Sequence, residues 1–274
     1  MGLGIAQTAA SSGYAVIMID VDLEAAVKGI AKIDGQLSRL AAKGRINEEQ
    51  RLETLGKLRP AAGLKEAGDA AVVIEAAPEH KALKLQLFRE LDQICDRKAV
   101  LASNTSSIPI TEIAAAAKHD DRVIGMHFMN PVPVMPLVEV IRGLATSDEA
   151  AGRIMSLAQA MGKTPVEVRD VPGFAANRIL MPMINEAIYT VYEGVASPAA
   201  VDQVMMLGMR HPMGPITLAD FIGLDTCLSI METLHQGFGD PKYRPCPLLR
   251  SYVAAGWLGR KTGRGFYVYE EQER

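Results

Sequence analysis

The sequence has too few cysteines for a disulfide framework. Its 274 residues include three, Cys95, Cys227 and Cys246, an odd number at distant positions without metal-ligand spacing. Secreted domains stapled by disulfides carry an even number of cysteines in a short chain, and structural zinc sites place cysteines in close pairs. The three residues therefore predict reduced thiols, a cytoplasmic protein and no metal site.

Long apolar runs, excess charge of one sign and targeting segments are also missing. No stretch approaches the ~18 consecutive apolar residues of a membrane span, and no basic segment precedes an apolar one as in a signal peptide. Met1-Gly2 resembles the start of a myristoylation motif, but Ala6 stands where that motif requires Ser or Thr. A net charge of −3 gives no electrostatic reason to bind nucleic acid or an anionic membrane. We expect neither partner.

Apolar residues make up 49% of the chain and charged residues 22%, which is typical of a globular enzyme. In the first 170 residues, apolar runs alternate with amphipathic stretches, as in a parallel sheet that helices cover on both faces. The predicted helices are 3–12, 23–43, 47–58, 81–95 and 148–162, and the predicted strands are 14–20, 70–77, 99–106, 122–128, 137–143 and 164–169. Asn47 and Gln50 form the pattern of a capping box. The fold class is α/β, with a mixed sheet at its far end.

The character of the sequence changes after PGF (172–174). Stretches that favour helix follow at 177–194, 198–209 and 217–236. We therefore predict a domain boundary near residue 170, with an α/β domain over 1–170 and an all-helical domain over 171–274.

The first residues have the pattern of a dinucleotide-binding unit, which makes the predicted sheet Rossmann-like and doubly wound. Gly2 and Gly4 open a helix, and the apolar run YAVIMID (14–20) ends in Asp20. An acid at the end of the second strand of such a unit hydrogen-bonds the adenosine ribose and repels the 2′-phosphate of NADP, so it favours NAD. The alternative is an acid that only caps the following turn, and Asp20 alone does not decide between the two.

A polar segment, SNTSS (103–107), follows a buried strand. Open α/β sheets bind ligands at the carboxyl ends of their strands, so these side chains are candidates for ligand contact. One of them could also cap the helix that begins near Ile110, and both interpretations can hold together.

His127 ends one apolar strand and Glu139 lies inside the next. A lone histidine there is more often a satisfied core residue, and a lone glutamate on a strand usually faces solvent, but a buried glutamate is rare unless it is paired. Two strands joined by a short loop can bring both side chains into contact across the sheet. A carboxylate on one imidazole nitrogen fixes the tautomer and leaves the other nitrogen as a general base near neutral pH.

With these motifs in place, the chain resembles the short-chain L-3-hydroxyacyl-CoA dehydrogenase family from Met1 to about Tyr269. The resemblance rests on long, ordered motifs: SNTSS (103–107), GMHFMNPVPVMPLVEVI (125–141), PGFAANRI (172–179), HPMGP (211–215) and GWLGRKTGRGFY (256–267). It implies NAD-dependent oxidation of short-chain 3-hydroxyacyl-CoA, run backwards as reduction of 3-oxoacyl-CoA. It also implies a homodimer formed through the helical domain.

The resemblance assigns catalytic roles to four residues. His127 would take the proton of the 3-hydroxyl group, and Glu139 would orient His127 and stabilise the imidazolium. Ser106 would hydrogen-bond the substrate oxygen, and Asn177 would help to position substrate and His127.

The resemblance also implies binding residues. Lys43 would contact coenzyme A, and Ser106 and Asn177 would bind the substrate. The implied cofactor-binding residues are Gly2, Gly4, Asp20, Glu79, Lys84, Asn104, Ser106, Asn130 and Lys261. The alternatives are ordinary solvated helix charges for Lys43 and Lys84, a helix cap for Asn177 and a first-turn acid for Glu79.

The N-terminus departs from the family pattern, in which a first strand leads into G-x-G-x-x-G. Gly2 matches the last glycine of that motif, so about a dozen residues of the pattern are missing, including a central strand. We expect two inner strands with unpaired backbone groups, each buried orphan costing about 1–3 kcal/mol.

Two further hypotheses remain open. The chain could belong to a related dehydrogenase that acts on another hydroxy acid, such as a sugar acid. Alternatively, it could be a truncated, inactive chain that only dimerises or binds coenzyme A.

Overall fold

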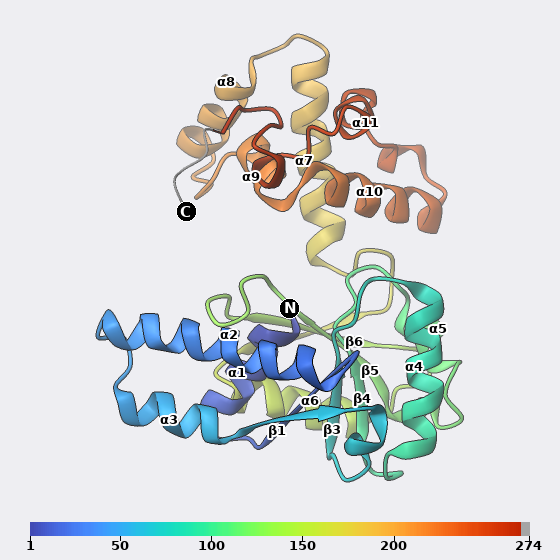
Figure 1. The fold of residues 1–274 in the computed structure, drawn as a ribbon. Helices are drawn as coiled ribbons and strands as arrows, with labels where there is room; N and C mark the ends of the chain where they lie inside the picture. The colour runs from blue at the N-terminus through green and yellow to red at the C-terminus, as the bar shows by residue number, and fades with distance from the viewer. Residues whose placement is uncertain (270–274) are drawn as a thin grey trace. The chain divides into compact units, whose positions relative to one another are not determined.

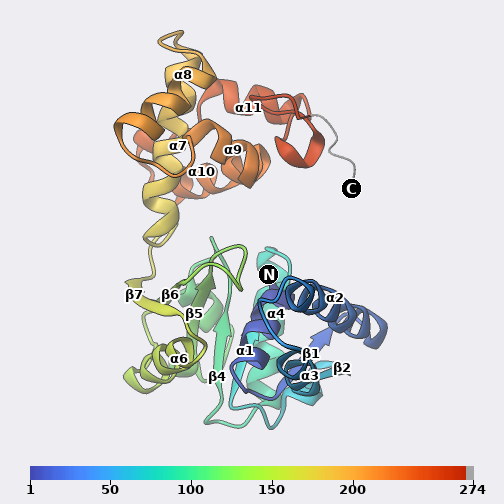
Figure 2. The same cartoon turned by 90° about the vertical axis from the view of Figure 1, so that its left-hand side faces the viewer.

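A computed structural model describes residues 1–269. The described chain divides into two compact units, unit 1 over Met1–Val171 and unit 2 from Pro172 onward (Figures 1 and 2). Unit 1 is an α/β sheet structure and unit 2 is all-helical, so the predicted fold class is confirmed.

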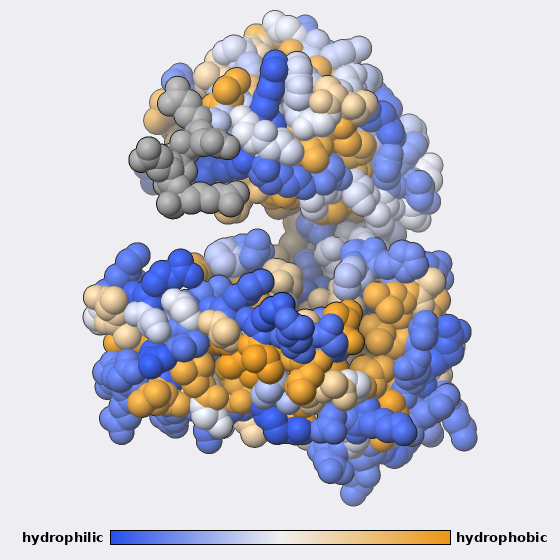
Figure 3. Space-filling view, viewed as in Figure 1, coloured by the Kyte–Doolittle hydropathy of each residue, from blue (hydrophilic) through white to orange (hydrophobic). Residues whose placement is uncertain are grey.

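The N-terminal part of unit 1 packs three helices against a two-stranded parallel sheet. Its elements are α1 (Gly2–Ser11), β1 (Val16–Asp20), α2 (Leu23–Ala42), α3 (Glu48–Gly56) and β2 (Leu58–Ala62). The predicted capping box is present, because Asn47 and Gln50 each accept the backbone N–H of the other. Ala10, Ile33 and Leu37 form the buried core here, and Figure 3 shows further hydrophobic residues gathered between α2 and β2.

The rest of unit 1 is a five-stranded mixed sheet in the order β3-β4-β5-β6-β7. Its elements are β3 (Val72–Glu75), α4 (Lys81–Ile94), β4 (Val100–Ser103), α5 (Ile110–Ala114), β5 (Val123–Phe128), β6 (Leu137–Arg142), α6 (Asp148–Ala160) and β7 (Thr164–Arg169), with the 3₁₀ turns η1 (Leu64–Ala67) and η2 (Asp120–Arg122). Only the β5–β6 pair is antiparallel. The continuous apolar runs are buried as expected: every residue of β4 and β5 is inaccessible or nearly so.

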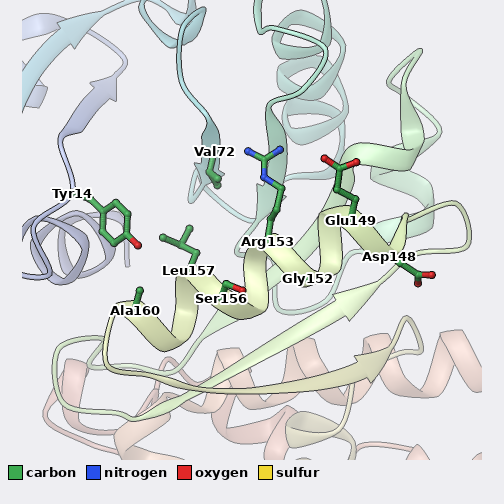
Figure 4. Close-up of a pocket in the computed structure, with 9 residues that line it drawn as sticks. All are labelled: Tyr14, Val72, Asp148, Glu149, Gly152, Arg153, Ser156, Leu157 and Ala160. Carbon is green, nitrogen blue, oxygen red and sulfur yellow. The ribbon is translucent and has the colours of Figure 1, made fainter.

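The two sheets of unit 1 do not hydrogen-bond to each other, and their facing edges are β1 and β3. Both edge strands still pack against one core, which includes Val16 and Val72 as partly buried members. A hollow of about 580 Å³ lies between the start of β1, the start of β3 and α6, lined among others by Tyr14, Val72 and Leu157 (Figure 4). The division into two sheets agrees with the expected absence of a central strand between β1 and β3.

Unit 2 is built around the long helix α7. Its elements are α7 (Ala176–Tyr192), α8 (Pro198–Gln203), the π-helical turn η3 (Val204–Gly208), α9 (Pro215–Ile222), α10 (Leu224–Phe238), the 3₁₀ turn η4 (Pro241–Tyr243), α11 (Pro247–Ala254) and the 3₁₀ turn η5 (Arg260–Thr262). Ile188, Ile216 and Leu234 are fully buried in its core. The carboxylate of Asp220 accepts the backbone N–H of Phe266 and of Tyr267, which fixes the C-terminal segment to α9.

Three details of the helix and strand prediction were wrong. The strand β2 was not predicted, and α11 was not predicted either. The helix expected over 217–236 is two helices, because Gly223 adopts φ +103, a conformation that ends α9 and that a residue with a side chain rarely adopts.

Candidate active site

His127 and Glu139 lie directly opposite each other in the antiparallel β5–β6 pair. The distance from His127 Nδ1 to Glu139 Oε2 is 2.9 Å, and the two residues are 8% and 2% exposed. The predicted contact across the sheet is therefore confirmed. With Nδ1–H donating to the carboxylate, Nε2 of His127 keeps its lone pair and can accept a proton.

The polar segment 103–107 continues from the end of β4, the neighbour of β5. Asn104 Oδ1 accepts the backbone N–H of Phe128 at 2.9 Å, which joins this segment to the residue after His127. Ser106 is half-buried two residues further on. The expectation that a residue of this segment caps the helix near Ile110 was wrong: the carboxylate of Asp170 accepts the backbone N–H of Ile110 and of Thr111.

Glu79 binds the same segment from the loop after β3. Its Oε1 atom accepts the backbone N–H of Ser106 at 3.0 Å and that of Ser107 at 3.1 Å. Burial alone would raise the pKa of Glu79, but hydrogen bonds from Thr105, Ser107 and the Ser106 amide, together with the charge of Lys84, hold this pKa below its ordinary value. Glu79 is therefore a carboxylate at neutral pH, and it precedes α4 rather than lying in its first turn.

Lys84 is buried in α4 and does not lie on a solvated helix face. Its side chain is 1% exposed, and Nζ lies 2.7 Å from Glu75 Oε1 and 3.4 Å from Glu79 Oε2. Sequence reasoning missed Glu75, although the acid at the end of the apolar run AAVVIEAA (70–77) carries the same signal that revealed Glu139.

The N-terminus of helix α1 is suited to bind the pyrophosphate of the dinucleotide that Gly2 and Gly4 predict. No side chain caps its N-terminus and no acid lies in its first turn, so the first amides and the helix dipole are open to a pyrophosphate. Gly4 packs against the loop after β5, where an added Cβ would approach Val132 Cβ to 2.9 Å. Asp20 is exposed at the end of β1 and accepts the adjacent Val21 N–H, which leaves its second oxygen for a ribose hydroxyl.

Asn130 is exposed in the loop between β5 and β6. The ammonium group of Lys163 holds this loop by donating to the carbonyl oxygens of Val132 and Met135 at 2.5 and 2.9 Å. Burial lowers the pKa of Lys163. Sequence reasoning missed this lysine, because nothing in its immediate neighbours suggests burial.

The remaining predicted site residues are Lys43, Asn177 and Lys261, and each lies on or next to a different element. Lys43 is exposed at the C-terminal end of α2 in unit 1. In unit 2, Asn177 is 9% exposed in the first turn of α7, where Ala175 and not Asn177 holds the N-cap position. Lys261 is exposed and its Nζ lies 2.7 Å from Asp225 Oδ2.

Among residues 1–269, no group of three or more His, Cys, Asp or Glu side chains is arranged to hold a metal ion. Within the same range, no helix is both long and apolar enough for a bilayer.

An α/β sheet with an acid at the end of β1, an open helix N-terminus and a buried imidazole–carboxylate pair on two adjacent strands defines a dinucleotide-dependent oxidoreductase. Comparison with known families makes the assignment specific. Residues 1–171 match the NAD-binding domain of 3-hydroxyacyl-CoA dehydrogenase, and residues 173–269 match the C-terminal domain of the same enzyme. The chain belongs to the 3-hydroxyacyl-CoA dehydrogenase family.

Individual relatives agree with this assignment. A probable 3-hydroxybutyryl-CoA dehydrogenase of Bacillus subtilis is 63% identical, with 99% of this chain and 95% of the relative covered. A 3-hydroxybutyryl-CoA dehydrogenase of Bradyrhizobium diazoefficiens is 51% identical over 98% of this chain and 92% of its own. The crystal structure of (S)-3-hydroxybutyryl-CoA dehydrogenase PaaH1 from Ralstonia eutropha superposes with a TM-score of 0.97 at 49% identity, covering 99% of this chain and 96% of that one.

Proposed function

We propose that this chain catalyses the reversible, NAD-dependent oxidation of short-chain (S)-3-hydroxyacyl-CoA, such as 3-hydroxybutyryl-CoA, to 3-oxoacyl-CoA. The observation that carries the proposal is the buried contact between His127 Nδ1 and Glu139 Oε2 at the carboxyl end of the sheet. The names of the similar enzymes supply the substrate class.

The catalytic roles are proposed from the His127–Glu139 contact and from the resemblance to the family. His127 Nε2 accepts the proton of the 3-hydroxyl group, and bound NAD supplies the acceptor for the hydride that leaves C3. The carboxylate of Glu139 stabilises the imidazolium that forms and holds the ring in position. Ser106 donates a hydrogen bond to the substrate oxygen, and Asn177 helps to position the substrate.

The cofactor site is proposed along the carboxyl edge of unit 1. The first amides of α1, near Gly2 and Gly4, bind the pyrophosphate, and Asp20 binds the adenosine ribose. Asn104, Asn130 and Lys261 are further proposed cofactor-binding residues. Lys43 contacts coenzyme A through its exposed ammonium group.

Two properties of the whole protein belong to the same proposal. The chain forms a homodimer through unit 2, where Val204, Leu207 and Met209 expose apolar side chains. It is cytoplasmic, which is supported by three buried cysteines that are all free thiols.

The test follows the loss of NADH absorbance with acetoacetyl-CoA, using this chain and a second form. The second form carries an apolar strand and the earlier glycines of G-x-G-x-x-G ahead of Met1. NADH oxidation by either form supports the proposal, and oxidation by the second form alone shows that the strand between β1 and β3 is needed to hold the cofactor. If neither form oxidises NADH, the proposal is wrong, and turnover of a sugar acid would assign the other hydroxy-acid class instead.

A further inference from the structure

A chain of three charged side chains runs from the end of β3 to the loop before α4. Lys84 lies in the middle, with its ammonium group 2.7 Å from Glu75 Oε1, 3.2 Å from the carbonyl oxygen of Ala77 and 3.4 Å from Glu79 Oε2. The ammonium group donates hydrogen bonds to Glu75 and to the Ala77 carbonyl, and its contact with Glu79 is an ion pair. Since the side chain is 1% exposed, Lys84 offers no accessible surface to a ligand.

The outer end of this chain holds the polar segment that follows β4. The Oε1 atom of Glu79 accepts hydrogen bonds from Thr105 Oγ1 at 2.5 Å, from the backbone N–H and Oγ of Ser106 at 3.0 and 3.5 Å, and from the backbone N–H and Oγ of Ser107 at 3.1 and 2.8 Å. Three consecutive residues therefore converge on one carboxylate oxygen, while Lys84 faces the other oxygen.

Glu75, at the inner end of this chain, is also held by hydrogen bonds from the protein. Glu75 accepts the Oγ hydrogen of Ser103 at 2.7 Å and the backbone N–H of Ala77 at 2.6 Å. Glu75 is 6% exposed and Ser103 is fully buried, so the carboxylate has exchanged water for protein donors on both oxygens. Removing one partner of such a buried pair is strongly unfavourable, which makes Glu75 and Lys84 a fixed support for Glu79.

We propose that Glu79 is a positioning residue, which fixes the backbone of Ser106 and thereby aims the Ser106 hydroxyl at the substrate oxygen. Glu79 acts through Ser106, and the buried Glu75–Lys84 pair acts through Glu79. This role differs from the direct cofactor contact that the family resemblance implies for Glu79 and Lys84. It rests on the proposed function, because that function gives Ser106 its task.

The first experiment is a double-mutant cycle with Glu79→Ala and Ser106→Ala, measured as kcat and KM for acetoacetyl-CoA and as Kd for NADH. Glu79→Ala should lower kcat/KM about 100-fold, since a misplacement of about 1 Å has effects of that size. NADH affinity should stay within about twofold. In the Ser106→Ala background, the same substitution should cost less than about threefold, because the group that Glu79 positions is already gone.

The control for this cycle is Glu112→Gln. Glu112 is a half-buried acid on α5 that pairs with Lys81 of α4, so it carries the same charge as Glu79 and also pairs with a lysine of α4. It should leave kcat/KM unchanged. Thr105→Val removes one of the five hydrogen-bond donors to Glu79 Oε1 and should have an intermediate effect. An undiminished loss for Glu79→Ala in the Ser106→Ala background, or a tenfold weaker NADH affinity, would overturn the proposal.

Amide hydrogen exchange tests the same idea without any turnover. Glu79→Ala should speed exchange at Ser106 and Ser107, whose amides it binds, and should leave Ile110 and Thr111 unchanged, whose amides bind Asp170. If the wild-type chain does not turn over acetoacetyl-CoA, the proposed function fails while this measurement still decides the positioning. Unchanged exchange at both serines would show that Glu79 does not hold the segment.

Discussion

The ring of His127 is oriented by the contact of its Nδ1 atom with Glu139 Oε2. Because Nδ1 donates to Glu139 at 2.9 Å, only Nε2 can accept the substrate proton. His127→Gln keeps a polar side chain but cannot act as a base, so we expect kcat with acetoacetyl-CoA to fall about 10²–10⁴-fold, the usual contribution of general acid–base catalysis. The binding constant for NADH, measured by fluorescence, should change little.

The matched control is His211→Gln. His211 stands in the conspicuous motif HPMGP, and we interpret it as a structural residue. The control should retain the wild-type kcat. An undiminished kcat in His127→Gln would show that another group takes the proton.

The His127–Glu139 contact was predictable for a physical reason. Side chains alternate along a strand, and a short loop fixes which residues oppose each other, so two polar residues in adjacent apolar runs can be paired from the order of residues alone. Glu75 meets the same criterion and was missed because its partner, Lys84, lies on a helix. Asp170 caps α5 from 60 residues away, a tertiary contact that no local pattern encodes.

The helices and strands with a strong hydrophobic periodicity were predicted. Those that form mainly through contacts with distant parts of the chain were not. The strand β2 reads LRPAA, and Pro60 with two alanines gives it little strand character. It forms because it pairs with β1 in parallel register, from Val16 opposite Leu58 to Asp20 opposite Ala62. Tertiary pairing overrides local propensity there.

One ionic cluster links α4 to the start of β5 and makes stability depend on pH. Asp92 on α4 accepts hydrogen bonds from Arg122 Nη2 at 2.9 Å, from the Lys118 amide at 2.9 Å and from His119 Nδ1 at 3.1 Å. Burial alone would raise the pKa of Asp92, but these hydrogen bonds, led by that of Arg122, hold it below its ordinary value. The stabilisation is therefore complete above about pH 4 and is lost as the pH falls through the lowered pKa.

Asp92→Asn tests this dependence. We expect the free energy of unfolding at neutral pH to fall by about 3–5 kcal/mol, because the guanidinium of Arg122 stays buried without its carboxylate. The variant should also lose less stability than the wild type between about pH 5 and pH 3. Urea unfolding across this range measures both effects, with the exposed Asp120→Asn as control. Parallel pH curves for wild type and Asp92→Asn would contradict the assignment.

At the scale of the whole molecule, the strands of unit 1 form two sheets rather than one. In the described residues, unit 1 contains two separate sheets, β1-β2 and β3-β4-β5-β6-β7, as the family pattern leads us to expect for this sequence. The apolar core that both sheets share still holds them in one unit, because burial against α1 and α6 does not require the missing hydrogen bonds.

Unit 2 carries an exposed apolar surface that is suited to the association of two copies of the chain. In the turn η3, Val204 and Leu207 are 61% and 81% exposed, and Met209 follows at 62%. Burying a leucine side chain stabilises an interface by about 1.5–3 kcal/mol, and a buried aspartate in its place adds an unpaired charge. We expect the wild type to sediment as a dimer of the 29.5 kDa chain and Leu207→Asp as a monomer. Leu144→Asp, at a position in unit 1 that is 92% exposed, should remain dimeric. A monomeric wild type, or a Leu207→Asp variant that still dimerises, would show that unit 2 does not associate through this turn.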